Sequence, residues 1–341
     1  MITIKKSEAV DQSWNYPLRQ FENEATIFQS TYWAEYLKKR GEKPFFILAQ
    51  DEHDREAGLL LYSKGKLKNL PLVGSLSAYY HWLYGPLILE KEKEALVFNV
   101  MLNFLESEAR REKIYCIANA FPPIFRDNEG YFNHFGFTGR PVGTFVVDLR
   151  KPENLLWSSI KKEARHCVRK ALTNNVIVVD VSDEEGLLEY YKLYRDFRKK
   201  SKLQAMPFSN FQAMWDIFFK RKFLKIFTAK LNGKPMAGIM ALVYNGVIYE
   251  LSVAESEFGR ESKLYPNDLL KWHVIKWGSE NKCNFFNLAG VELESTSTRA
   301  AGIFRYKAKW GGELVKFHVY TRIYSRFRRG ISRLSKKLGL R

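Results

Sequence analysis

The clearest candidate for a phosphate-binding charge pattern lies in residues 155–178, LLWSSIKKEARHCVRKALTNNVIV. Arg165 and Arg169 are four residues apart, so they share one face of a helix, and Lys170 follows directly. Two guanidinium groups on one face can clamp a phosphate group. A solvated basic face would give the same pattern. Phosphate binding and plain surface charge therefore both stay open for these three side chains.

A second candidate site is the aromatic run YYHWLY at residues 79–84, which contains Tyr80 and His81. Aromatic side chains with polar tips suit the walls of ligand sites. Aromatic residues are also common in ordinary cores, so packing before Gly85 and Pro86 is the competing interpretation.

Other chemistries find no support in the sequence. No serine or cysteine stands in a recognisable triad context. The six histidines and the three cysteines show neither metal-ligand nor disulfide spacing. We expect Cys167 to be a packing residue, because free cysteine tends to be buried. The sequence predicts no metal and a reducing, cytoplasmic setting.

The composition describes a folded, strongly basic chain of 341 residues with a net charge of +18 and 46% hydrophobic residues. This apolar content excludes the disordered class, and the length favours two domains. No segment approaches the ~18 apolar residues of a membrane span, and the N-terminus lacks the pattern of a secretory signal. The charge points to a polyanionic partner such as tRNA, a nucleotide-linked sugar or an anionic membrane, with a lysine-rich surface as the alternative.

The same order of elements is predicted in both halves of the chain. Ala49 stands eight residues before the pair Ala57-Gly58, and Ala229 stands eight residues before the pair Ala237-Gly238. In each half a helix and a short apolar strand follow. The second half also has two hairpin signals, Asn-Gly at 232–233 and at 245–246. The predicted helices are 28–40, 96–110, 154–174, 197–202, 209–219 and 268–281; the predicted strands are 45–50, 57–62, 114–118, 142–149, 224–230, 235–244, 247–254 and 284–288. This repeat favours a duplicated α/β domain.

Residues 286–312, FNLAGVELESTSTRAAGIFRYKAKWGG, resemble the signature of the Fem aminoacyltransferases. An apolar strand enters a glycine loop, then a Glu/Ser/Thr-rich stretch, then an aromatic-lysine pair before an aromatic residue. Residues 155–178 resemble the basic helix that opens the second Fem domain, and residues 28–37, FQSTYWAEYL, resemble the opening of the first. The chain is thus identified as a compact member of this family, without the coiled-coil arm that some members insert.

The resemblance implies an α/β fold with mixed sheets and two tandem GNAT-like acyltransferase domains. Domain 1 would span residues 1–150, hold the acceptor and be completed by residues 316–341. Domain 2 would span residues 151–315 and hold the donor.

The resemblance also implies an aminoacyltransferase without a cofactor, in which aminoacyl-tRNA is the co-substrate. The acceptor would be an amine of a nucleotide- or lipid-linked muropeptide of peptidoglycan synthesis, attacking the ester directly. Lys307 matches the lysine credited with stabilising the tetrahedral intermediate, while Lys309 is interpreted as a surface lysine. The expected donor-binding residues are Tyr306, Trp310, Arg165, Arg169 and Lys170; the expected acceptor-binding residues are Trp33, Tyr80, His81, Gln204, Tyr249 and Glu292.

Departures and alternatives remain. Gln204 and Met206 stand where muropeptide-binding relatives carry a Thr and an Arg, which puts a standard peptidoglycan precursor in doubt. One alternative is a coenzyme A-dependent N-acyltransferase of a surface polysaccharide pathway, although residues 257–263 offer only Gly259 for a pyrophosphate cradle. The other alternative is a non-catalytic RNA-binding protein.

The C-terminal segment can form a basic amphipathic helix. Phe327, Ile331, Leu334 and Leu338 recur at helical spacing among arginines and lysines. The segment could lie on an anionic membrane or pack on domain 1. We expect a monomer in the cytoplasm, with possible peripheral contact to the inner face of the membrane.

Overall fold

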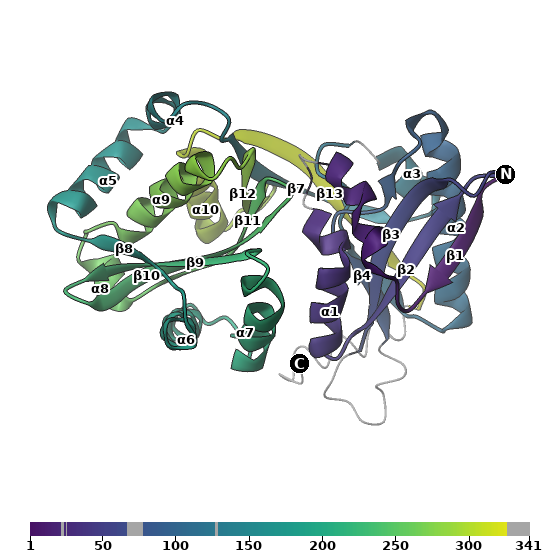
Figure 1. Ribbon diagram of the computed structural model, residues 1–341, viewed down its shortest axis with the longest axis horizontal. Coiled ribbons are helices and arrows are strands. Elements are labelled where there is room, and N and C mark those ends of the chain that lie inside the picture. Colours follow the sequence, from purple (N-terminus) through teal and green to yellow (C-terminus); the bar gives the residue numbers. More distant parts are fainter. Residues whose placement is uncertain (22–23, 25, 67–77, 127–128, 326–341) are drawn as a thin grey trace. The chain divides into compact units, whose positions relative to one another are not determined.

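The computed structural model describes residues 1–21, 24, 26–66, 78–126 and 129–325 (Figure 1). The chain divides into two compact units: unit 1 contains Met1–Val142 and Lys316–Arg341, and unit 2 contains Gly143–Val315. The division falls inside strand β7 (Thr138–Asp148) rather than after residue 150, because this strand continues without a break and gives residues to both units. The C-terminal amphipathic segment predicted from Phe327 onward lies outside the described residues.

Unit 1 is built on a mixed sheet. Its strands follow the order β1 (Thr3–Ser7), β2 (Lys43–Gln50), β3 (Glu56–Gly65), β4 (Tyr79–Trp82), β6 (Cys116–Ala120) and β13 (Glu313–Ile323), with the short β5 (Leu87–Ile88) beside β3. All neighbours are antiparallel up to β4, and β4 pairs with β6 in parallel. Helix α1 (Thr31–Lys39) covers one face of the sheet and α2 (Glu94–Arg111) the other, and α3 (Glu129–His134) follows β6 (Figure 1).

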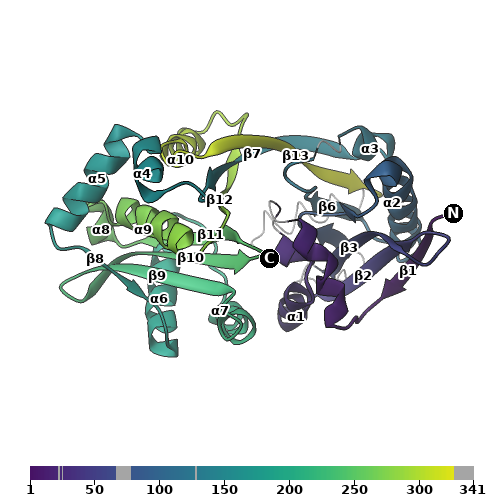
Figure 2. The ribbon, with the colours of Figure 1, turned by 45° about the horizontal axis from the view of Figure 1, so that its top comes forward.

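Unit 2 repeats this plan. Its strands follow the order β8 (Ile177–Asp180), β9 (Leu224–Leu231), β10 (Lys234–Tyr244), β11 (Val247–Glu255), β12 (Phe285–Glu292) and β7. They are antiparallel up to β11, and β11 pairs with β12 in parallel. One face is covered by α4 (Glu153–Ser159), α5 (Lys162–Thr173), α9 (Pro266–Glu280) and α10 (Thr298–Ala308); the other by α6 (Glu184–Lys200) and α7 (Phe208–Met214), as Figures 1 and 2 show. A π-helix, Trp215–Phe219, extends α7, and the short α8 (Glu257–Glu261) follows β11.

The matching strand orders confirm the predicted mixed α/β class and the internal repeat. The two Asn-Gly hairpins are also present, because Asn232, Gly233, Asn245 and Gly246 all have positive φ. In two other places the prediction was wrong. The single helix expected at 154–174 is two helices, since Ile160 has an extended backbone between α4 and α5. The helix expected at 197–202 is the end of the longer α6.

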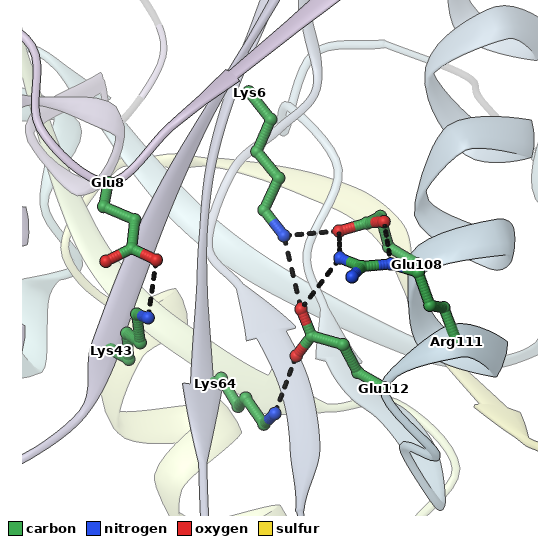
Figure 3. A network of polar contacts seen from close by, with 7 residues as sticks. All are labelled: Lys6, Glu8, Lys43, Lys64, Glu108, Arg111 and Glu112. Carbon is green, nitrogen blue, oxygen red and sulfur yellow. Dashed lines mark hydrogen bonds and ion pairs between the residues drawn. The ribbon is translucent and has the colours of Figure 1, made fainter.

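A network of charged side chains joins the edge of the unit 1 sheet to the end of α2 (Figure 3). Lys6 Nζ lies 2.5 Å from Glu108 Oε2 and 3.3 Å from Glu112 Oε1, and Lys64 Nζ lies 2.6 Å from Glu112 Oε2. Arg111 Nη2 lies 2.7 Å from Glu108 Oε2. Carboxylates at the C-terminal end of a helix are opposed by the helix dipole. The three cations offset that repulsion and connect strands β1 and β3 to α2.

Candidate active site

The neighbouring strands β11 and β12 separate in the middle of unit 2. They pair only at Val247 with Phe285, Ile248 with Phe286 and Tyr249 with Asn287. Beyond these pairs β11 continues to Glu255 and β12 to Glu292 as strands that no longer pair with each other. The backbone groups that face this separation are free of the ladder between the two strands, so a substrate can bond to them.

Lys307 on helix α10 reaches the start of the separated part of β12. Its Nζ donates to the carbonyl oxygens of Ala289 at 3.2 Å and of Gly290 at 3.1 Å. Ala289 has a left-handed backbone with φ of 60°, which breaks the regular strand at this point. Thr144 on β7 donates to the same Ala289 carbonyl at 2.9 Å. The lysine is thus held by backbone groups of fixed position.

Lys307 is half-buried, and no acidic side chain of the described residues forms an ion pair with it. The pKa of Lys307 is lowered to about 8, mainly by burial; the charge of Glu250 acts to raise it, and the charge of Lys271 adds to the lowering. No carboxylate within the described part of the chain comes within ion-pair distance of its Nζ. An ammonium group has three N–H donors, and the two carbonyls use two of them. One donor remains for a substrate oxygen.

Two buried ion pairs support this region, and sequence reasoning missed both. Lys271 of α9 binds Glu250 of β11, and the two residues are 1% and 6% exposed. Lys309 Nζ lies 2.5 Å from Asp268 Oδ1. Lys309 is buried, so its interpretation as a surface lysine was wrong. A signal existed: Glu250 stands in the apolar strand VIYELSVAE, where a charge must find a partner if it is buried.

Residues 158–308 match the family model described as an acetyltransferase (GNAT) domain. Lys307, Lys271 and Glu250 all fall inside this match. Most of unit 2 is therefore similar to a GNAT domain. Such a domain indicates a transferase of the acyltransferase type.

Solved structures extend the likeness to the whole chain. FemX is similar with a TM-score of 0.74 at 16% identity, covering 97% of this chain and 99% of that one. A tandem GNAT protein from the clavulanic acid biosynthesis pathway has a TM-score of 0.59 at 10% identity, covering 95% and 99%. L-PGS from Bacillus licheniformis has a TM-score of 0.56 at 13% identity, covering 98% and 99%. No curated protein matches the sequence significantly. At these identities the likeness shows the fold, and it confirms the tandem GNAT architecture expected from the Fem resemblance.

The two expected donor-side aromatic residues near Lys307 make contacts within unit 2. Trp310 is 0% exposed and packs in the core of unit 2. Tyr306 is half-buried, and its hydroxyl donates to the carbonyl oxygen of Asn267 at 3.1 Å. Lys309 Nζ lies 4.5 Å from the centre of the Tyr306 ring. Tyr306 therefore links α10 to the start of α9.

The three basic residues of α5 do not form a phosphate clamp. Arg165 Nη1 donates to the carbonyl oxygen of Ser158 at 3.0 Å and also to that of Ile160. It thereby caps the end of α4 at the helix break. Arg169 is exposed above the Trp157 ring at 5.6 Å, and Lys170 lies 5.3 Å from the Tyr265 ring. Only Arg169 and Lys170 keep their charged groups clear of backbone carbonyls.

The expected acceptor-side residues of unit 2 do not gather at one place. Tyr249 pairs with Asn287, so it stands where β11 and β12 begin to separate. Glu292 is exposed at the end of β12. Gln204 is exposed, and its carbonyl oxygen accepts from Arg198 Nη2 at 2.7 Å. Tyr249 thus lies where the separation begins and Glu292 at the end of the separated part of β12, whereas Gln204 is on neither strand.

In unit 1 the expected acceptor-side residues have structural surroundings. Trp33 is buried against Phe28, and Tyr80 is fully buried, so both side chains pack within unit 1. His81 Nε2 lies 2.6 Å from Glu42 Oε2 and 2.7 Å from Ser63 Oγ. Burial acts to raise the pKa of Glu42, but His81 and other neighbours lower it to about 2. His81 is therefore hydrogen-bonded within its own unit.

Across the described ranges no three His, Cys, Asp or Glu side chains come together as a possible metal site. None of the helices that the structure describes is both long and apolar enough to cross a membrane.

Proposed function

We propose that unit 2 transfers an aminoacyl group from aminoacyl-tRNA to an amine of a cell-wall-type peptide precursor. The observation that carries the proposal is the half-buried ammonium group of Lys307, held beside the separated strands with one donor unused. The Fem resemblance of residues 286–312 and the FemX-like fold support the same assignment.

In this proposal Lys307 stabilises the transition state. The neutral amine attacks the ester carbonyl, and the negative charge that develops on the carbonyl oxygen meets the free N–H of Lys307. A pre-positioned donor of this kind is worth roughly 10²–10³ in rate. The nitrogen–carbon bond forms, the carbon–oxygen bond to the ribose breaks, and the ribose oxygen takes the proton from nitrogen.

The start of α9 argues against the coenzyme A alternative. A pyrophosphate is usually held by free amides at a helix N-terminus. Here the buried carboxylate of Asp268 lies in the first turn, and burial raises its pKa, which is the mark of an unfavourable place for negative charge. Gly259 is explained by packing, since a Cβ there would lie 2.5 Å from the Met236 carbonyl oxygen. Both observations favour a donor that needs no such cradle.

The acceptor is the less defined half of the proposal. The Fem resemblance supports a nucleotide- or lipid-linked muropeptide, and a lipid-linked acceptor would place the protein at the cytoplasmic face of the membrane. Gln204 and Met206 replace the Thr and Arg of muropeptide-binding relatives, which favours an acceptor that differs from the standard precursor.

The test is a transfer assay with charged total tRNA. Each amino acid is labelled in turn, and an extract of wall precursors supplies acceptors. RNase-sensitive transfer of label is expected, and Lys307→Met should lower its rate by about 10²–10³. Arg305→Met is the matched control, because Arg305 is exposed on the same helix.

Three results would contradict the proposal. Label that moves from acyl-coenzyme A instead would establish the coenzyme A alternative. Binding of tRNA without turnover would favour the non-catalytic alternative, and so would an activity that Lys307→Met leaves unchanged.

A further inference from the structure

Unit 2 contains a cavity of about 530 Å³ between the last turns of α6 and the junction of β11 with α8. This volume falls in the range of small-molecule sites. The cavity is lined by apolar, acidic and basic side chains: Leu193, Asp196, Phe197, Lys199, Lys200, Glu255, Ser256 and Glu257.

Two of the three carboxylates in the cavity wall form ion pairs, and the third does not. Asp196 Oδ1 lies 3.1 Å from Arg195 Nη2, and Glu257 Oε2 lies 2.5 Å from Lys200 Nζ. For Glu255, by contrast, the described residues provide no cation within ion-pair distance. Glu255 is therefore the wall carboxylate left for a ligand. Its apolar neighbours there are the buried Leu193 and the half-buried Phe197.

The surroundings of Glu255 favour the arrival of a positive charge. Burial raises the pKa of Glu255 to about 7, with the charge of Asp268 on α9 adding to the rise; Arg260 on α8 and the amide of Asn267 on α9 oppose it. The charged groups of α6 that line the same cavity are Asp196, Lys199 and Lys200. A bound cation would favour the ionised carboxylate, so cation binding and proton release are coupled.

Glu255 also belongs to the neighbourhood of the candidate active site. Burial raises the pKa of the Tyr306 hydroxyl well above its usual value, and the charges of Asp268, Glu250 and Glu255 add to that rise. Tyr306 directly precedes Lys307 on α10. The charge of Glu255 therefore acts on the residue next to the proposed catalytic lysine.

We propose that this cavity binds a primary ammonium group carried on an aliphatic chain. The methylene groups would lie against Leu193 and Phe197, and the ammonium group would bind the Glu255 carboxylate. The inference rests on the proposed function, in which both substrates carry such a group: the acceptor amine would bind in its protonated form and give up its proton before it attacks, and the aminoacyl group of the donor has its α-ammonium group.

Direct binding tests the cavity without any transfer reaction. The probe is n-pentylammonium, followed by ligand-detected NMR on the full chain, with 1-pentanol as the uncharged comparison. We expect Glu255→Gln to weaken n-pentylammonium binding roughly 10- to 100-fold, because a charge-assisted hydrogen bond is lost. Glu261→Gln on α8 is the matched control, because Glu261 is exposed and does not line the cavity. Affinity for the ammonium should rise between pH 6 and pH 8 as Glu255 ionises.

A second variant keeps the proposal testable if Glu255→Gln does not fold. Phe197→Ala should remove the gain in affinity from methylammonium to n-pentylammonium, while Glu255→Gln should weaken both. The proposal is overturned if 1-pentanol binds as tightly as n-pentylammonium, or if Glu255→Gln binds the ammonium like the wild type.

Kinetics then identify the source of the ammonium group. A raised KM for the acceptor in Glu255→Gln assigns the cavity to the acceptor amine, and a raised KM for aminoacyl-tRNA assigns it to the α-ammonium group. Unchanged values for both substrates overturn the role of the cavity in transfer. Glu255-dependent ammonium binding without any tRNA-dependent transfer would instead leave this inference standing and refute the proposed function.

Discussion

Replacing Lys271 by methionine should destabilise unit 2 strongly. The variant removes the cation of the buried pair and leaves the Glu250 carboxylate without compensation at 6% exposure. Breaking a buried ion pair from one side costs about 3–5 kcal/mol. Unit 2 spans residues 143–315. For a domain of this size each kcal/mol lowers the Tm by roughly 2–4 °C, so a fall of roughly 6–20 °C is expected.

The double variant Lys271→Met/Glu250→Leu separates this cost from simple damage to packing. An apolar pair of similar volume often replaces a buried ion pair without loss, so the double variant should recover to within about 1 kcal/mol of the wild type. Calorimetry and urea unfolding of the full chain give both values. Lys276→Met is the matched control on α9: its ion pair with Glu153 at 3.1 Å is exposed and worth about 0–1 kcal/mol.

Two results would refute this reasoning. Lys271→Met within about 1 kcal/mol of the wild type would mean that the Glu250 charge is solvated or neutralised in another way. A double variant no more stable than Lys271→Met would mean that Lys271 stabilises unit 2 through contacts other than its pair with Glu250, for instance through the cation–π contact of its Nζ with the Phe286 ring at 5.3 Å.

Two further predictions concern pH. Lys307, with a pKa of about 8, is protonated below that pH, and the protonated form is the one that stabilises an oxyanion. The value of kcat/KM should therefore fall as the pH rises through about 8. Any activity that remains in Lys307→Arg should lack this fall, and a fall at the same pH in the variant would assign the titration to another group. In unit 1, hydrogen bonding from Arg111 is the main cause that lowers the pKa of Glu108 to about 2. A carboxylate with a lowered pKa stabilises the fold above its usual pKa of 4.5 and loses that contribution as the pH falls to about 2. The free energy of unfolding, measured as a function of pH, should show this loss, at most about 3 kcal/mol, and the loss should be smaller in Glu108→Gln. An equally steep loss in the variant would mean that Glu108 is not the group responsible.

The local and repeated features of the fold could be predicted from the sequence. The Asn-Gly pairs at 232–233 and 245–246 could be placed because few residues other than glycine and asparagine tolerate positive φ. Lys307 could be proposed because its neighbours in the sequence form a long motif. Both kinds of signal depend on residues that are close together along the chain.

Contacts between distant residues could not be obtained in the same way. Glu250 and Lys271 are ionisable residues in an apolar strand and helix, but nothing in the sequence says that they face each other. The sequence repeat also misleads by one position: Ala49 pairs with Gly58, whereas Ala229 pairs with Ala237. As a result Gly58 packs on α2 and Gly238 packs on α6, and a one-residue shift exchanges the two faces of a strand.

The position of strand β13 in the sequence affects how the protein folds during synthesis on the ribosome. Its residues Tyr320, Arg322 and Ile323 pair with Ala120, Ile117 and Cys116 of β6, some two hundred positions earlier in the chain. Because synthesis runs from the N-terminus, the whole of unit 2 emerges before unit 1 receives this strand. Until then β6 has an exposed edge, which is a place where aggregation can start. The later half of the polypeptide therefore becomes structurally complete before the earlier half.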